Sequence, residues 1–204
     1  MSLFFGGRSD PILVKHFSFI NYEWLTWPQN AKLQIQHLTV KNGIRKALTK
    51  LSAVLTNSSF PLESLKIFVD DSTAEEFRDE VVQEARKVEI VHGSSSTFTI
   101  GPENWNFLPA NIHFESTKLL PDDSIMAVIR NWRTSEAAPG RRCSVGLSND
   151  REDKCFDFVK ENGVITIPIN HTSELRVAVK DRDGSQYIKC RPTSMLVLEV
   201  VAKM

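Results

Sequence analysis

Short apolar triplets recur along the first 115 residues of the chain. In each triplet the apolar positions are spaced three and then two residues apart, and successive triplets begin 21, 27, 23 and 24 residues apart. The triplets are Val14/Phe17/Phe19, Ile35/Leu38/Val40, Leu62/Leu65/Ile67, Ala85/Val88/Ile90 and, more loosely, Pro109/Ile112/Phe114. Because residues two apart point to the same face of a strand, the pattern predicts five short strands that must stack on one another to bury their apolar faces.

Helical patterns lie between these predicted strands. One helix is predicted after Gly43 by Ile44, Leu48, Leu51 and Leu55, and another by a Ser72/Glu75 capping pair ahead of Phe77, Val81 and Ala85. An alternation of strands and helices favours right-handed crossovers and a parallel sheet. The interpretation is an α/β fold whose first half is a degenerate leucine-rich-repeat-like strand/helix solenoid. An ordinary α/β sandwich of the same strands is the alternative.

The second half of the chain has a different pattern. A helix is predicted after Pro121-Asp122-Asp123, then a strand over 143–147 and a second helix near Ser148-Asn149. Alternating apolar residues from 164 to 201, interrupted by a predicted Asp183-Gly184 turn, indicate a β-rich C-terminal segment with a hairpin. Since no Gly-, Ser- or Pro-rich linker divides the chain, we expect one domain over 1–204. It has a repeat-like part at 1–120, and helices plus C-terminal strands at 121–204.

The amino-acid composition and charge of the chain restrict the kinds of partner that we expect. The 204 residues include 25 basic and 25 acidic side chains, giving a formal net charge of zero. A nucleic-acid-binding protein usually carries a basic excess, so we expect no nucleic-acid partner. No apolar run approaches the roughly 20 residues that span a bilayer, so we expect no membrane association. The three cysteines, Cys143, Cys155 and Cys190, are an odd number without metal-ligand spacing, which favours reduced thiols and an intracellular (cytoplasmic or nuclear) location.

No catalytic signature is present in the sequence. The nucleophile elbow GxSxG and the phosphate-binding patterns GxGxxG and GxxxxGK[ST] are all missing. We therefore expect no enzyme activity, no cofactor and no metal. His16 and His37 hold equivalent places in their triplets and would stand about 5 Å apart on parallel neighbouring strands, which is half of a metal site. A metal-dependent or hydrolytic enzyme using these histidines and the acidic run at Asp70-Asp71 is the alternative.

Two groups of residues are candidates for binding a partner. Trp24 and Trp27 follow the first predicted strand, and Trp105 precedes the fifth. Tryptophans in loops commonly anchor interfaces, although the same side chains can simply cover the end of a core. The other group is the polar sheet face, where we expect His16, His37, Ser18, Thr39, Lys66, Glu89 and His113.

Three segments resemble a known group of proteins. Leu3-Phe4-Phe5-Gly6-Gly7-Arg8, the run from Ser58 to Leu65, and Ile129-Arg130-Asn131-Trp132 are similar to a nematode-expanded family of uncharacterised domains, which resembles F-box-associated domains. The resemblance covers most of the chain, but its motifs are structural. F-box-associated domains are thought to hold substrates for ubiquitin ligases, so the resemblance implies a protein-interaction role.

The expectation is therefore a non-catalytic protein–protein interaction module, related to the substrate-recognition part of F-box-associated ubiquitin-ligase adaptors. The protein partner itself is not identified by the sequence. An F-box is a helical module of about forty residues, and nothing ahead of Phe4 supplies one. We therefore do not expect direct ligase docking. A truncated, inactive paralogue is a further alternative.

Overall fold

The computed structural model describes the chain in eleven stretches. They comprise residues 10–20, 27, 30–41, 43–69, 77–92, 107–116, 120, 124–147, 159, 163–181 and 194–203, of which 27, 120 and 159 are single positions within otherwise undescribed segments. The chain divides into two compact units, Met1–Phe98 and Thr99–Met204, and each is described by itself. That both units form one folded domain stays a prediction.

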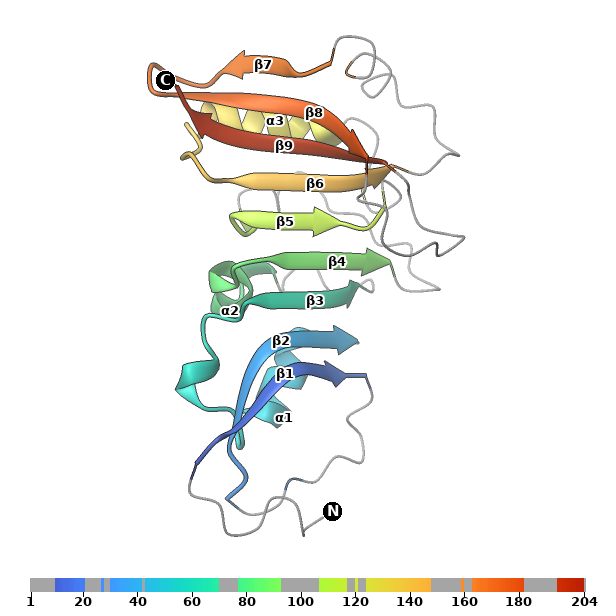
Figure 1. Ribbon diagram of the computed structural model, residues 1–204, viewed down its shortest axis with the longest axis vertical. Coiled ribbons are helices and arrows are strands. Elements are labelled where there is room, and N and C mark those ends of the chain that lie inside the picture. The colour runs from blue at the N-terminus through green and yellow to red at the C-terminus, as the bar shows by residue number, and fades with distance from the viewer. Residues whose placement is uncertain are drawn as a thin grey trace. The chain divides into compact units, whose positions relative to one another are not determined.

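The first unit is built on four parallel strands (Figure 1). They are β1 (Ile12–Phe19), β2 (Leu33–Lys41), β3 (Ser64–Val69) and β4 (Val88–His92), in that spatial order. The register aligns Phe17 with Leu38, Leu38 with Leu65, and Leu65 with Val88. These are the middle residues of the first four triplets. The predicted side-by-side, parallel arrangement of these strands is therefore confirmed.

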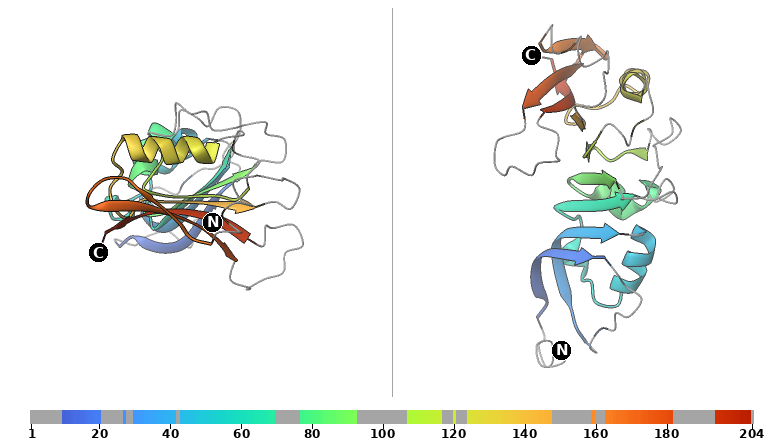
Figure 2. Two further views of the ribbon diagram at one scale, coloured as in Figure 1. Left: turned by 90° about the horizontal axis from the view of Figure 1, so that it is seen from above. Right: turned by 90° about the vertical axis from the view of Figure 1, so that its right-hand side faces the viewer.

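Two short helices cover one face of this sheet (Figure 2). Helix α1 (Ile44–Leu51) buries Ile44, Ala47 and Leu51 and is followed by the 3₁₀ turn η1 (Asn57–Ser59). Helix α2 (Glu80–Glu84) is capped by Asp79, whose side chain accepts a hydrogen bond from the Val81 backbone N–H at 3.1 Å. The predicted Ser72/Glu75 capping pair lies outside the described residues.

The second unit combines parallel and antiparallel pairing. Its elements are β5 (Asn111–Phe114), α3 (Ser124–Thr134), β6 (Arg142–Leu147), β7 (Ile165–Pro168), β8 (Ser173–Asp181) and β9 (Ser194–Ala202). The strands lie in the order β5-β6-β9-β8-β7, and only the β5–β6 pair is parallel. The end strand β7 carries Pro168, as expected for a proline in a sheet. Helix α3 buries the predicted apolar face of Ile125, Val128, Ile129 and Trp132.

The predicted leucine-rich-repeat-like solenoid is wrong. The described residues hold nine strands and three complete α-helices, so the described part of the chain is strand-rich. In a solenoid each repeat runs in the same direction, whereas β9 and β7 both run antiparallel to β8. The triplets report which face of each strand is buried, but they contain no information on the connection between strands. The start of the predicted helix near Ser148-Asn149 and the Asp183-Gly184 turn lie outside the described residues, whereas Val159, further along that predicted helix, is helical and 2% exposed.

A break in alternation explains the triplet spacing in β1 and β2 and shapes the open face of the first unit. In β2, Leu33 and Ile35 are buried, and so are Leu38 and Val40, which have the opposite parity. The adjacent strand β1 breaks at the same level, because Val14 pairs with Ile35 and Phe17 with Leu38. Apart from the exposed Leu13, both strands therefore keep their apolar side chains on the helix side before and after the break.

A candidate binding surface on the open sheet face

The face of the first-unit sheet that points away from α1 carries rows of polar side chains. Alternation places them there, because their neighbours in each strand point into the core. The register aligns Ser18 with Thr39, Thr39 with Lys66, and Lys66 with Glu89. One row of four residues thus crosses four strands, and all four were predicted to lie on this face. We call this surface the open face.

A second row on the open face holds two stacked histidines. The rings of His16 and His37 have centroids 4.5 Å apart and an interplanar angle of 17°. His37 Nδ1 is hydrogen-bonded to Ser64 Oγ at 2.8 Å, and Ser64 lies opposite His37 in the register. The predicted proximity of the two histidines is confirmed, and the contacts fix the orientation of the His37 ring.

The third polar contact on the open face is an ion pair. Lys66 Nζ lies 2.8 Å from Glu89 Oε1, and the two side chains are 24% and 23% exposed. Lys66 Nζ also lies 5.8 Å from the centroid of the Phe68 ring. Solvent-accessible ion pairs contribute about 0–1 kcal/mol, so the contribution of this partly exposed pair to stability is small. Its main effect is to hold two charged groups in fixed positions on the surface.

Of the three candidate tryptophans, only Trp27 falls within the described residues. Its ring centroid lies 6.0 Å from that of Phe17, and its Nε1–H donates to the Lys50 carbonyl at 3.1 Å. This contact joins the segment after β1 to the last turn of α1, so Trp27 covers one end of the core. Trp24 and Trp105 lie outside the described residues.

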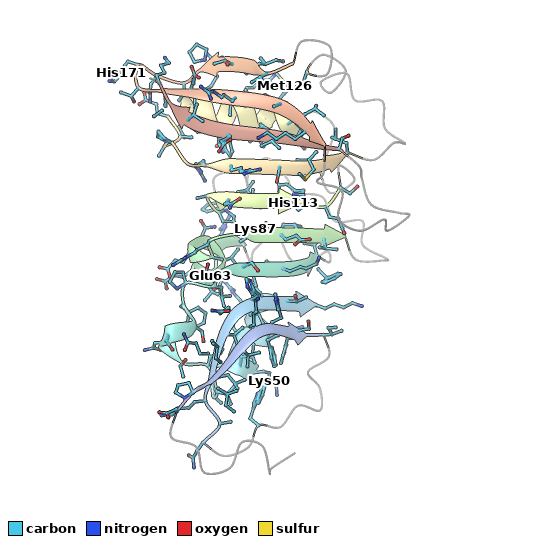
Figure 3. All side chains as sticks on the ribbon, in the orientation of Figure 1. Lys50, Glu63, Lys87, His113, Met126 and His171 are labelled. Carbon is cyan, nitrogen blue, oxygen red and sulfur yellow. The ribbon has the colours of Figure 1, made fainter. Side chains whose placement is uncertain are left out.

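His113 belongs to the second unit, on β5 (Figure 3). It is only 5% exposed, and its Nδ1 is hydrogen-bonded to Ser144 Oγ at 2.9 Å. The structure thus shows the same histidine–serine pairing across two parallel strands as in His37–Ser64. His113 was expected on a solvent-exposed sheet face, but its side chain is buried.

The described residues offer little for nucleophilic or metal chemistry. Cys143 is fully buried, and this burial raises the pKa of its thiol to about 12, so the reactive thiolate is strongly disfavoured. Within the described part of the chain, no group of three or more His, Cys, Asp or Glu side chains is arranged to hold a metal ion. The acidic run at Asp70-Asp71 lies outside that part, as do Cys155 and Cys190.

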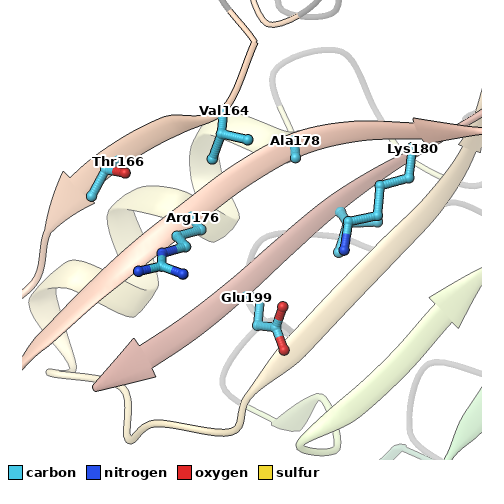
Figure 4. Close-up of a pocket in the computed structure, with 7 residues that line it drawn as sticks. Val164, Thr166, Arg176, Ala178, Lys180 and Glu199 are labelled. Atoms are coloured by element: carbon cyan, nitrogen blue, oxygen red, sulfur yellow. The ribbon is translucent and has the colours of Figure 1, made fainter. Parts of the chain in front are cut away.

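Sequence reasoning missed a hollow on the second unit. It has a volume of about 420 Å³ and opens on the face of β7, β8 and β9 (Figure 4). The lining residues are Val164, Thr166, Arg176, Ala178, Lys180, Val197 and Glu199. Arg176 is paired with Glu174 at 3.0 Å. The only signal in the sequence was that Arg176, Ala178 and Lys180 alternate on one face of a predicted strand.

Large apolar side chains are exposed at the end of the first-unit sheet. Leu13 is 61% exposed, and Ile20, the residue after β1, is 54% exposed. Among the described strands, β1 pairs only with β2.

No helix in the described part of the chain is long and apolar enough to cross a bilayer.

Fold and surface together define a strand-rich α/β protein with helices on one sheet face and fixed polar rows on the other. The chain belongs to the family described as Domain of unknown function (DUF3557), whose model matches residues 1–149. The match spans the first unit and continues through β6 of the second. No curated protein and no solved structure matches the chain.

Proposed function

We propose that this chain is a non-catalytic protein-binding module and that the open face is its binding surface. The observation that carries the proposal is the pre-arrangement of that face. A stacked histidine pair, a histidine–serine hydrogen bond and a lysine–glutamate ion pair hold its polar groups in place. A partner that binds such a surface does not have to supply the free energy needed to order flexible side chains.

The chemistry of the open face suits a polar, mixed-charge partner surface. One row presents a cation, Lys66, and an anion, Glu89, beside hydroxyl groups, and the next row adds imidazole groups. Lys15 on β1 is a further exposed cation. Charged groups in fixed positions favour partners with complementary charges and disfavour others. A role in holding substrates for ubiquitin ligases is the finer form of this proposal. It is supported only by the resemblance of the quoted segments to F-box-associated domains.

Affinity enrichment from an extract of the organism's own cells tests the proposal. Thr39→Arg places a bulky charged side chain in the centre of the open face, between Ser18 and Lys66. Thr49→Arg makes the same change on the exposed side of α1 and is the matched control. We expect proteins recovered with the wild-type chain and with Thr49→Arg to be lost with Thr39→Arg, provided that circular dichroism shows all three folded.

Two results would count against this function. The first is recovery of the same partners by Thr39→Arg and by Thr49→Arg, which would move the binding surface elsewhere. The second is recovery of no protein above background by the wild-type chain. Partners that include no ubiquitin-ligase component would remove the ligase form of the proposal and leave the binding module intact.

A metal-binding role is a second candidate, because two imidazoles already lie side by side in His16 and His37. Imidazole nitrogen is a common zinc ligand, but a zinc site usually has four ligands. Titration with Zn²⁺ followed by calorimetry tests this candidate. A one-to-one complex that is lost in His16→Ala would support it, and equal binding by the variant would exclude these histidines.

A further inference from the structure

The outer edge of β1 is well suited to pairing with another strand. β1 is eight residues long and pairs only with β2 among the described strands. Its helix-side residues Ile12, Val14 and Phe17 are only half-buried, whereas their partners in β2, Leu33, Ile35 and Leu38, are at most 2% exposed. A strand added at this edge would therefore cover apolar surface that the chain alone leaves in contact with water.

The pattern of faces in β1 is symmetric about its centre. Along Ile12–Phe19 the residues alternate as half-buried and exposed, then two exposed residues follow one another, and the alternation resumes with the opposite parity. The centre of the pattern lies between Lys15 and His16. The strand therefore presents the same sequence of helix-side and open-face residues when it is read from either end.

This symmetry matches what antiparallel self-pairing requires. Directly opposite residues in an antiparallel pair point to the same face of the sheet, and a two-fold axis pairs each residue with its mirror position in the other copy. If the axis lies between Lys15 and His16, Ile12 faces Phe19, Leu13 faces Ser18 and Val14 faces Phe17. All of these pairs match in face. Moving the axis by one residue along the strand in either direction brings a helix-side residue opposite an open-face residue.

We propose that two copies of this chain associate through antiparallel pairing of their β1 strands in this register. The pairing places the half-buried residues Ile12 and Val14 against Phe19 and Phe17 of the other copy. It also places no lysine opposite a lysine, because Lys15 faces His16. The inference does not depend on what the open face binds, although a paired sheet would extend that face across both copies.

Engineered cysteines test the register. Leu13→Cys and Ser18→Cys place thiols on opposite strands of the proposed pair, where directly opposite Cβ atoms lie about 4.5–5.5 Å apart. Two cysteines at position 13 of the two copies are five positions apart along the strand, about 16 Å, which is too far for a disulfide. The same separation holds for two cysteines at position 18. We therefore expect mild oxidation to link a mixture of the two variants into dimers. Either variant alone should stay largely unlinked.

A control and a second variant keep the proposal open to refutation. A mixture of Leu13→Cys with Ser52→Cys, which lies at the exposed end of α1, should give only background linkage. The double substitution Leu13→Asp/Ser18→Asp brings aspartates face to face at two places. It should raise the dimer dissociation constant at least about tenfold, because each facing like-charged pair is unfavourable.

Light scattering measures the mass of the wild-type protein in solution and so shows directly whether it is a dimer. A mass of twice the chain, lost in the double aspartate variant but kept in Thr49→Asp on α1, supports the pairing. A monomeric wild type at high concentration overturns it. Equal cross-linking of single variants and mixture also overturns it. Both outcomes leave the proposed binding function of the open face unaffected, because that function is tested by recovery of partner proteins with a variant at Thr39 on β2, and not by self-association.

Discussion

Replacement of Ser59 by alanine should destabilise the first unit by removing one buried hydrogen-bond acceptor. Ser59 lies in η1, is 2% exposed, and its Oγ accepts a hydrogen bond from the Ile35 backbone N–H at 3.0 Å. The same hydroxyl donates to the Leu33 carbonyl at 3.3 Å. In this way η1 satisfies the backbone of β2 just before the break in alternation, where β3 has not yet begun.

The cost follows from which groups lose their partners. The Leu33 carbonyl keeps two other donors, the Thr56 backbone N–H at 3.0 Å and Thr56 Oγ1 at 3.2 Å. The Ile35 N–H loses the Ser59 hydroxyl and is left as a buried donor. An unsatisfied buried polar group costs about 1–3 kcal/mol, and we expect the free energy of unfolding to fall by that amount.

Urea unfolding followed by circular dichroism measures this change. Amide hydrogen exchange adds a local measurement, in which the Ile35 N–H of the variant should exchange faster. Ser58→Ala is the matched control, because Ser58 is exposed and its hydroxyl is hydrogen-bonded to Thr56 Oγ1 at 2.8 Å, not to the backbone of β2. Equal stability of the two variants, within about 0.5 kcal/mol, would refute the reasoning and show that the hydroxyl of Ser59 does not support β2.

Two further predictions concern the second unit. Trp132→Ala should destabilise the protein by about 3–5 kcal/mol, since Trp132 is 1% exposed on α3. Met126→Ala on the same helix, at a 39% exposed position, should cost much less in the same urea titration. Burial raises the pKa of the Cys143 thiol to about 12 from its ordinary value of 9.0, so the folded state binds the thiol proton more tightly than the unfolded state. The stabilisation is complete below about pH 9 and is lost as pH rises towards 12. Unfolding titrations of the wild type should therefore lose more stability between pH 9 and 11 than those of Cys143→Ala, and an equal loss in both would contradict the assignment.

The strand register of the first unit could be predicted because the buried residues of each strand are apolar and recur at a fixed spacing in the sequence. A step of three between Ile35 and Leu38 records the break in alternation, and the same step in β1 keeps the two strands aligned. From this alignment the contact between His16 and His37 followed without coordinates. Local spacing also identified the apolar face of α3, where a periodic pattern covers three turns.

Connections and long-range returns could not be predicted in the same way. Strand triplets do not show whether a helix or a loop joins two strands, so the solenoid was inferred from a period that the second unit does not follow. The start of α2 was also missed, because Asp79, a common N-cap residue, was not distinguished from earlier polar residues. The hollow beside Arg176 and Glu199 depends on antiparallel pairing of β8 with β9. Residues separated by more than twenty positions in the sequence line this hollow, so no local sequence pattern predicts it.

The end strands of the two units differ in a way that bears on how far assembly can proceed. β7 has four residues and includes Pro168, which lacks a backbone N–H and so cannot complete a new ladder of hydrogen bonds. β1 has eight residues and no proline. A chain with two receptive edges could add copies without limit and form fibrils, whereas a chain with one receptive edge is saturated once that edge is shared. The proline in β7 therefore disfavours strand addition at that edge, whereas no proline interrupts β1.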